Sequence, residues 1–515
     1  MWERSRPWTA AKSADPTGFA GASCSRGGPS RQPGRRCRQP ARGRGEALAR
    51  QPAPDWRLGF RSLRREVRIG SLPVDGRLPP WLRGTLVRNG PALFEQGDAR
   101  FRHWFDGLAM LHAFSCRAGR VGYANRFLRS SQHAAVTTEG RIRYSEFATD
   151  PCRAIFNGAA AMFVPAPVPN ANVHVDRLSR RFVALTEIPL PVQFDPVTLR
   201  TLGVRGRAPL AVTGTAHPHA DPLRGERYAF TTRLAPPSGY DVLVSERGGP
   251  SRVLAAIPEG QPGYMHSFAL TARHAVLAEF PFRLDPLETA LHWKPIIENF
   301  AWHAGQPARF HVVDRGTGRV RTLETEPYFA FHHVNAFEAR GRLWLDVCAY
   351  PDPGIIRSLY LDKLRGPAHS VPQAELRRYE LDLGTGRVRH RRLSDVPIEL
   401  PRINYERVNA RAYRYAYGTG LRDPGRSGFI DQIVKVDVET GAARTWREAG
   451  TFPGEPVFVA APGARREDDG AVLSVVLDAR AGRSFLLVLD ARSFREVARA
   501  RVPHHIPYGF HGRVF

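Results

Sequence analysis

The chain has 515 residues, a formal net charge of +26 at pH 7, and 42% hydrophobic and 10% aromatic residues. Its length exceeds the usual size of one hydrophobic core, unless the fold is a radial repeat in which each unit packs mainly on its neighbours. Only four of the 75 basic residues are lysine, and the arginines are scattered among acidic residues. This pattern favours a solvated basic surface over a nucleic-acid site. No run of 18 apolar residues occurs, which argues against a membrane-spanning helix.

The N-terminal segment differs in composition from the rest of the chain. Its first 50 residues carry 11 basic and 3 acidic side chains and much Pro, Gly and Ser, without the apolar core of a signal peptide. This composition predicts disorder. The segment is interpreted either as a transit peptide or as sequence upstream of a misplaced start codon. We expect residues 1–55 to be a disordered extension and residues 56–515 to form a single domain.

From residue 56 onward the recurring pattern is a β-hairpin. Short Val, Leu, Phe and Tyr runs flank turns of the form Asp-x-x-Thr-Gly at residues 314–318, 382–386 and 437–441. Looser copies occur near Asp195, Asp221, Asp478 and Asp490. In such turns Asp hydrogen-bonds the turn backbone and Gly supplies a positive φ. Because no comparable number of amphipathic helices occurs, the hairpins predict an all-β closed fold, and seven blades would take roughly 65 residues each.

The five cysteines are widely separated and include no Cys-x-x-Cys pair. They are Cys24, Cys37, Cys116, Cys152 and Cys348. This spacing argues against a disulfide framework and a thiolate metal site, and it favours a reducing compartment. The positive charge is compatible with attraction to anionic lipid headgroups. We therefore expect a cytoplasmic protein that can attach peripherally to a membrane.

Four histidines stand in distinctive phrases that are far apart in the chain. They are His217 in Thr-Ala-His-Pro-His, His266 in Tyr-Met-His-Ser-Phe, His332 in Phe-His-His-Val-Asn and His511 in Gly-Phe-His-Gly-Arg. Several imidazoles without a thiolate suit iron, copper, zinc or nickel. The separations of 49, 66 and 179 residues are too wide for a zinc-finger loop. Such ligands can converge only if the fold brings several distant segments to one point, which points to a metal on the axis of a large closed architecture.

These phrases, in this order, resemble the carotenoid cleavage oxygenase family. The resemblance begins near the Arg-Asn-Gly-Pro phrase at 88–91, continues through Trp-Phe-Asp-Gly at 104–107, and covers roughly residues 56–515. One departure is Leu108-Ala109, where the family more often has Asp and Gly. The resemblance implies a seven-bladed β-propeller with Fe(2+) on its axis. It also implies a helical and loop cap over the top face, to which residues 150–167 and 286–301 would belong.

The resemblance also implies which side chains form the site. It assigns the metal to His217, His266, His332 and His511. The residues alone leave a His-x-His motif open, because His217 and His219 would share one face of a strand. Three glutamates match the family's positions for carboxylates that orient the metal ligands, and each stands in an apolar run: Glu187, Glu399 and Glu455. Seven aromatic residues flank the motifs and are expected either to line a polyene tunnel or to pack in the core: Phe101, Trp104, Phe105, Tyr264, Phe268, Phe331 and Phe510.

The activity implied is that of a non-haem Fe(II) dioxygenase. It would use O2 to cleave a conjugated C=C bond of a carotenoid or apocarotenoid into aldehyde or ketone products, with a leaning toward the retinal-forming branch. We expect a lipophilic polyene, O2 and a membrane surface as partners, no nucleic acid, and a monomer. The alternatives are cleavage of a stilbene such as resveratrol, retinoid isomerisation, and a non-catalytic propeller that binds a lipid or a protein. The stilbene chemistry needs a Tyr or Lys base near the phenol, and lysine is scarce here.

Overall fold

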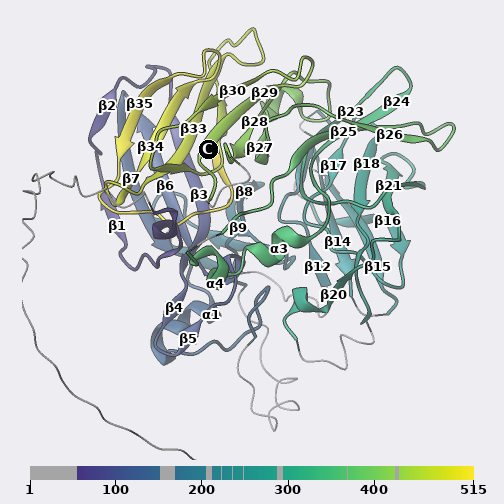
Figure 1. Cartoon of the computed structure of the whole chain (residues 1–515), viewed down its shortest axis with the longest axis horizontal. Helices are drawn as coiled ribbons and strands as arrows, with labels where there is room; N and C mark the ends of the chain where they lie inside the picture. Colours follow the sequence, from purple (N-terminus) through teal and green to yellow (C-terminus); the bar gives the residue numbers. More distant parts are fainter. Residues whose placement is uncertain are drawn as a thin grey trace, which may run out of the picture. The chain divides into compact units, whose positions relative to one another are not determined.

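Seven antiparallel sheets of four to six strands follow one another along the chain and form the blades of a β-propeller (Figure 1). The predicted all-β, seven-bladed fold is therefore confirmed. The structure is a computed structural model that describes residues 55–150, 169–204, 212–221, 223–234, 236–246, 249–286, 294–367, 369–423 and 428–515. The predicted extension, residues 1–55, lies outside these ranges except for Asp55, so its disorder and the domain boundary stay predictions.

The first four blades contain the following strands, in the order in which they are hydrogen-bonded. Blade one holds β1 (Val67–Ile69), β7 (Arg120–Phe127), β6 (Leu108–Arg117), β3 (Gly84–Leu93) and β36 (Gly512–Val514). Blade two holds β11 (Thr201–Val204), β10 (Val192–Phe194), β9 (Arg181–Leu185) and β8 (His174–Leu178). Blade three holds β12 (Val212–Gly214), β14 (Glu226–Arg233), β15 (Gly239–Glu246) and β16 (Arg252–Pro258), with β13 (His219–Asp221) also on β14. Blade four holds β17 (Ala269–Leu270), β18 (His274–Glu279), β21 (Ala308–Asp314) and β22 (Val320–Thr325).

The remaining blades and two short ribbons complete the strands. Blade five holds β23 (Phe329–Ala339), β24 (Arg342–Tyr350), β25 (Glu375–Leu381) and β26 (Val388–Arg392). Blade six holds β27 (Glu399–Arg402), β28 (Tyr415–Gly420), β29 (Gln432–Asp437) and β30 (Ala443–Trp446). Blade seven holds β2 (Val74–Gly76), β35 (Glu496–Arg501), β34 (Arg483–Asp490), β33 (Gly470–Asp478) and β31 (Thr451–Pro453), with β32 (Val457–Ala460) also on β33. The ribbons are β4 (Glu95–Gln96) with β5 (Ala99–Arg100), and β19 (Phe282–Leu284) with β20 (Phe300–Trp302).

The predicted hairpin turns are present, with the chemistry that the sequence indicates. Between β21 and β22, Asp314 Oδ1 accepts hydrogen bonds from the backbone N–H groups of Gly316 (3.0 Å) and Thr317 (2.7 Å). Gly318 closes this turn with φ +73°, in the left-handed region that favours glycine. Asp382 and Asp437 accept equivalent bonds between the last two strands of blades five and six. The repeated motif therefore links the two outer strands of a blade.

The propeller is closed by strands from both ends of the chain. The N-terminal strand β2 pairs with β35 in blade seven, where Asp75 stands opposite Arg499. The C-terminal strand β36 pairs with β3 in blade one, where Gly512 stands opposite Arg88. Because the first and last blades each borrow a strand from the opposite end, neither is left with an open seam there. This closure also brings the last residues of the chain to the innermost position of blade one.

Buried apolar side chains pack across the boundaries between neighbouring blades. Phe310 of blade four and Tyr379 of blade five, for example, lie with their ring centroids 5.0 Å apart. Burying aromatic rings of this kind supplies a large share of the stabilisation, at about 25 cal/mol for each Å² of apolar surface removed from water. The blades are thus held together by side-chain packing. This packing fixes where the inner strand of each blade lies relative to the axis.

Short helical segments lie in the connections between strands. They are η1 (Trp56–Phe60), η2 (Trp104–Asp106), α1 (Ser131–Ala134), η3 (Ala135–Glu139), η6 (Ile296–Asn299), α3 (Gly354–Ser358), α4 (Leu361–Leu364) and α5 (Tyr405–Val408). Backbone hydrogen bonds join several of these connections: Leu361 N–H to Arg102 O (2.8 Å), Trp104 N–H to Leu359 O (3.1 Å) and Ile297 N–H to Phe147 O (3.2 Å). We call residues 101–106, 128–150, 294–300 and 353–364 the cap. None of the helices within the described ranges has the length and apolarity that crossing a membrane requires.

The cap includes part of what the sequence predicts to be helical. Residues 294–301 contain the short helix η6, whereas residues 151–168 and 287–293 lie outside the described residues. Phe105 of the cap contacts Phe331 and Phe510, with ring centroids 5.8 and 5.2 Å apart. Since Phe331 and Phe510 directly precede His332 and His511, the cap lies over the face that carries these histidines.

Candidate metal centre

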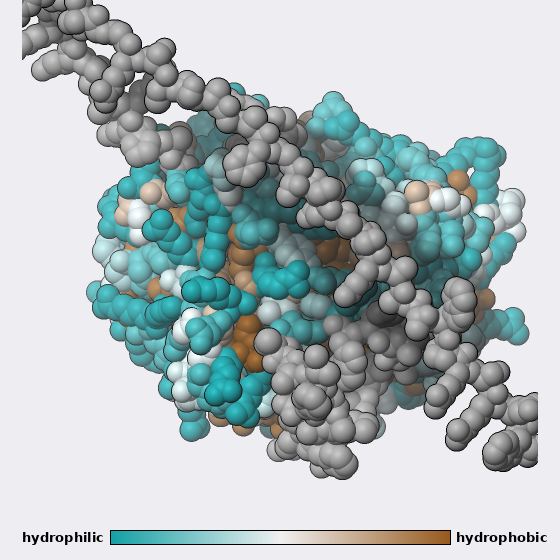
Figure 2. Space-filling view, turned by 60° about the horizontal axis from the view of Figure 1, so that its bottom comes forward, coloured by the Kyte–Doolittle hydropathy of each residue, from teal (hydrophilic) through white to brown (hydrophobic). Residues whose placement is uncertain are grey.

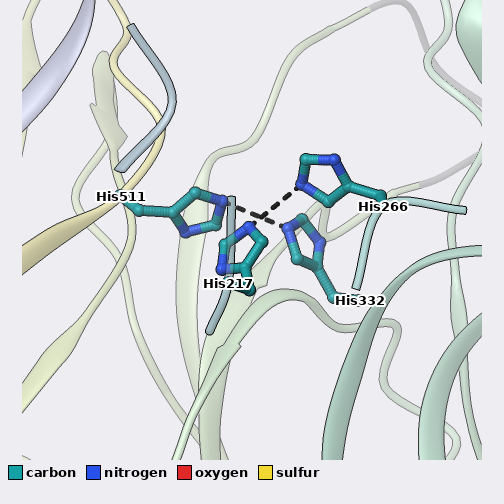
Figure 3. Close-up of side chains that lie close together, drawn as sticks. All are labelled: His217, His266, His332 and His511. Atoms are coloured by element: carbon teal, nitrogen blue, oxygen red, sulfur yellow. Dashed lines mark hydrogen bonds between the residues drawn. The ribbon is translucent and has the colours of Figure 1, made fainter. Parts of the chain in front are cut away.

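Four histidines from four different parts of the propeller meet at one point. One ring nitrogen from each of His217, His266, His332 and His511 lies within 4.8 Å of the others (Figure 3). His217 is half-buried and the other three are buried. In Figure 3 the four rings point inward toward one another, from chain segments on different sides. The structure therefore brings together all four histidines that the sequence predicts to be metal ligands.

Each of these histidines is positioned at the inner end of a blade. His217 lies in the short connection between β12 and β13, and His266 lies just before β17. His332 is in β23, where the pairing with β24 shifts register between Ala330 and His333. A register shift of this kind re-aims side chains that a regular strand would turn elsewhere. His511 directly precedes β36, so the closing strand places it on the axis.

The three predicted glutamates each contact one of the histidines. Glu187 Oε1 lies 2.6 Å from His266 Nδ1, Glu399 Oε2 lies 2.6 Å from His332 Nδ1, and Glu455 Oε1 lies 2.7 Å from His511 Nδ1. A carboxylate acceptor at Nδ1 fixes the proton there and leaves Nε2 as the nitrogen with a lone pair. The arrangement is the one in which a metal-bound imidazole is usually held.

Of the three carboxylates, Glu455 accepts the most hydrogen bonds within the described part of the chain. It is fully buried and accepts hydrogen bonds from Arg88, from Arg402 Nε (2.7 Å), from His511 and from the backbone N–H of Gly512 (2.9 Å). Burial alone would raise the pKa of Glu455, but the charges of Arg402 and Arg88 and the hydrogen bond from His511 hold that pKa well below its ordinary value. The carboxylate is therefore ionised and can keep the proton of His511 on Nδ1.

The contacts between the imidazoles test whether the site suits a cation. His332 Nε2 and His511 Nε2 face each other at 3.2 Å, and both rings carry their proton on the carboxylate-bound Nδ1. Two lone pairs at this distance repel unless a proton or a cation lies between them. Burial lowers the pKa of His511 to about 3, which disfavours an extra proton. Nitrogens bound at about 2.1 Å to one metal and at right angles lie roughly 3 Å apart, so the residues fit a shared metal ion.

The neighbouring histidines make contacts outside the cluster. His219 Nδ1 lies 2.9 Å from the hydroxyl of Tyr405, and its Nε2 lies 3.0 Å from the carbonyl of Phe268. His333 Nδ1 lies 2.8 Å from Ser267 Oγ. The geometry therefore favours the assignment of the metal to His217 and His332, which the family resemblance implies, over a His-x-His pair.

The seven motif-flanking aromatics divide into two groups. Trp104, Phe105, Tyr264, Phe331 and Phe510 belong to one hydrophobic cluster beside the histidines, in which Tyr264 also donates a hydrogen bond to Glu187 (2.7 Å). Phe101 and Phe268 belong to other clusters. The first group forms an apolar wall next to the four histidines, whereas Phe101 and Phe268 are core residues.

The sequence and the fold of this chain both match known proteins. The family profile described as "Retinal pigment epithelial membrane protein" matches residues 60–514. The mitochondrial carotenoid-cleaving dioxygenase of Macaca fascicularis is 33% identical over 513 residues, which cover 86% of this chain and 91% of that protein. The beta,beta-carotene 15,15'-dioxygenase of Homo sapiens is 33% identical over 512 residues, covering 85% and 91%.

The chain belongs to the carotenoid oxygenase family.

Solved structures agree with this assignment. The cobalt-substituted apocarotenoid oxygenase of Synechocystis matches with a TM-score of 0.78 and 27% identity, covering 90% of this chain and 98% of that chain. A chimera built from the same oxygenase and the retinal pigment epithelial protein matches with a TM-score of 0.79, with the same identity and coverage. The family resemblance and the seven-bladed fold predicted from the motifs are thus confirmed.

Two features of the centre escaped the sequence analysis. Arg88 and Arg402, which bracket Glu455, stand 367 and 53 residues from it along the chain. Arg88 opens the Arg-Asn-Gly-Pro phrase, so only its charge within a buried phrase could have signalled a role. His174, in Asn-Val-His-Val-Asp, is a fifth imidazole beside the cluster. It alternates with Asp176 across Val175 in β8, a pattern that does not by itself indicate burial beside the four histidines.

Proposed function

We propose that this chain is a non-haem iron dioxygenase that uses O2 to cleave a conjugated C=C bond of a carotenoid or apocarotenoid. One oxygen atom of O2 would enter each of the two carbonyl products. The proposal rests above all on the four converging imidazoles, three of them held by carboxylates, in a member of the carotenoid oxygenase family. One chain supplies every proposed ligand and carboxylate, so a monomer suffices for the reaction.

Each group of residues has a separate task in this proposal. His217, His266, His332 and His511 would bind Fe(2+), whose chemistry is the activation of O2. The glutamates orient three of these rings and hold the proton on Nδ1, without exchanging protons with the substrate. The apolar cluster that contains Phe105 and Phe331 excludes water and fixes the double bond that lies beside the metal.

The polar groups near the site do not favour the stilbene alternative. A phenolic substrate needs a free Lys or Tyr base beside it. The hydroxyl of Tyr264, which contacts the histidine cluster through Glu187, donates to that carboxylate and is not a free base. The apolar surroundings instead suit a long hydrocarbon. The face shown in Figure 2 is mostly hydrophilic at its edge and exposes hydrophobic residues toward its hollowed centre.

Product analysis tests the proposed reaction directly. Protein loaded anaerobically with Fe(II) would be mixed with detergent-dispersed β-carotene, an apocarotenal or resveratrol, and exposed to air. We expect shortened aldehydes from at least one polyene, with masses that locate the cleaved bond. Cleavage of resveratrol alone would replace this proposal by the stilbene reaction. A protein with one bound iron per chain that leaves all three substrates intact would contradict the proposed function.

We also propose that the protein is cytoplasmic and attaches peripherally to membranes, because its proposed substrates dissolve in lipid rather than in water. The free, buried thiols of Cys116 and Cys348 fit a reducing compartment. The apolar segment at residues 159–168 is the part of the sequence that we propose as the contact with lipid, and it lies outside the described residues. In flotation with anionic liposomes, the wild-type protein should rise with the lipid, and Met162→Asp or Phe163→Asp should reduce this fraction. Equal flotation of all three proteins would contradict the role of this segment.

A further inference from the structure

A fifth imidazole packs against the proposed metal ligands. His174 is the first residue of β8 and is 8% exposed. Its ring lies nearly parallel to that of His217, with the centroids 5.3 Å apart and an interplanar angle of 26°. Its edge faces His511 at 5.7 Å and 82°. Both arrangements are preferred geometries for packed aromatic rings.

The backbone of His174 is held firmly in this place. Asn89 Nδ2 donates hydrogen bonds to the carbonyl of His174 (3.1 Å) and to that of Ala171 (2.7 Å). The residue before His174 is also bonded to a proposed ligand: the N–H of His511 donates to the carbonyl of Val173 (3.1 Å). The start of β8 is therefore tied to β3 and to the residue before β36. A side chain at position 174 has little freedom to leave the cluster.

His217 differs from the other three proposed ligands in how its ring is held. His266, His332 and His511 each place Nδ1 against a carboxylate, which fixes the plane of the ring. Within the described part of the chain, the imidazole of His217 has no carboxylate hydrogen bond, and its backbone N–H is held by Thr215 Oγ1 (2.9 Å). Rotation of a histidine ring about χ2 is intrinsically soft. Another contact has to set the plane of the His217 ring, and the flat contact with His174 can do so.

The Nδ1 nitrogen of His174 does not account for its presence in the cluster. Its Nδ1 is buried and has no hydrogen-bond partner among the described residues. A buried polar atom in this state costs about 1–3 kcal/mol, so packing on the neighbouring rings, and not hydrogen bonding through Nδ1, is the contribution that this ring makes to the cluster.

We propose that His174 is a positioning residue that fixes the ring of His217 by stacking on it, in the place that carboxylates take for the other three ligands. The inference rests on the proposed metal site. Removal of an outer residue that orients a metal ligand typically lowers metal affinity about 10- to 100-fold. The same range is expected here, because a His217 ring free to turn presents its nitrogen to the metal for only part of the time.

Cobalt binding to the metal-free full chain tests this proposal without relying on activity. Co(II) affinity would be measured against a competing chelator, and its visible absorption would report the ligand geometry. His174→Ala removes the stack and should weaken Co(II) binding about 10- to 100-fold and shift the visible bands. His174→Phe keeps a flat ring, so its Co(II) affinity should stay within about threefold of the wild type and its visible bands should not shift. Val175→Ala is the matched control, because Val175 is buried on the same strand in a separate apolar cluster.

The outcomes separate this inference from the proposed function. Wild-type affinity in His174→Ala would overturn the stacking role, as would a loss in His174→Phe equal to that in His174→Ala. An equal loss in Val175→Ala would assign the effect to general packing and would also overturn it. A wild-type protein that binds neither Co(II) nor Fe(II) would instead overturn the metal site, and with it the proposed function.

Discussion

Replacing Glu455 with glutamine is expected both to destabilise the fold and to weaken metal binding. The side chain of Glu455 is 0% exposed and that of Arg88 is 5% exposed, so glutamine keeps the shape but leaves a buried guanidinium without its counter-charge. Breaking a buried ion pair in this way costs about 3–5 kcal/mol in the free energy of unfolding. Urea unfolding of the metal-free protein would measure this loss, and elemental analysis would measure the bound metal.

The matched comparison is Glu187→Gln. Glu187 holds His266 Nδ1 and the hydroxyl of Tyr264, and no arginine contacts it among the described ion pairs. Its loss should therefore lower metal affinity about 10- to 100-fold but change the free energy of unfolding by only about 1 kcal/mol. If both variants lost the same stability, the arginines around Glu455 would not have the electrostatic role that their geometry indicates.

Replacing His266 with alanine should abolish metal loading while the protein stays folded. His266 lies at a blade end, and its Nε2 faces His217 Nε2 at 3.0 Å. Loss of a residue that merely orients a ligand costs about 10- to 100-fold in metal affinity, so loss of a ligand should cost at least about 100-fold. Metal content after dialysis and polyene cleavage should fall together, while the circular dichroism spectrum stays that of the wild type.

His333→Ala provides the control for His266→Ala. His333 is half-buried and follows His332 directly in β23, but its side chain and its backbone N–H contact Ser267 Oγ and not the histidine cluster. We expect it to retain its metal and its cleavage activity. Retention of full metal content in His266→Ala would remove this residue from the site. Unfolding of that variant would show instead that the His266–Glu187 contact holds the blades together.

How far the sequence predicts the centre differs from residue to residue. His332 and His511 could be recognised from their phrases, because a metal ligand and its immediate neighbours form one local pattern. The pairing of Glu399 with His332 spans 67 residues, and the sequence predicts the role of the carboxylate but not its partner. Arg402 and His174 were missed, because an isolated Arg or His in a strand has no local signature of burial beside a metal site.

By itself, the sequence determined the hairpin repeat and the all-β closed fold, and its resemblance to the family assigned the four histidines that are proposed as metal ligands. These features depend on local chemistry: an Asp that caps a turn, a Gly with positive φ, and apolar runs that favour strands. Only the tertiary structure decided which residues meet. The pairing of β2 with β35 and of β36 with β3, the burial of Glu455 between Arg88 and Arg402, and the stacking of His174 on His217 all arise from the packing of blades. Contacts between distant segments depend on that packing and leave no pattern in the local sequence.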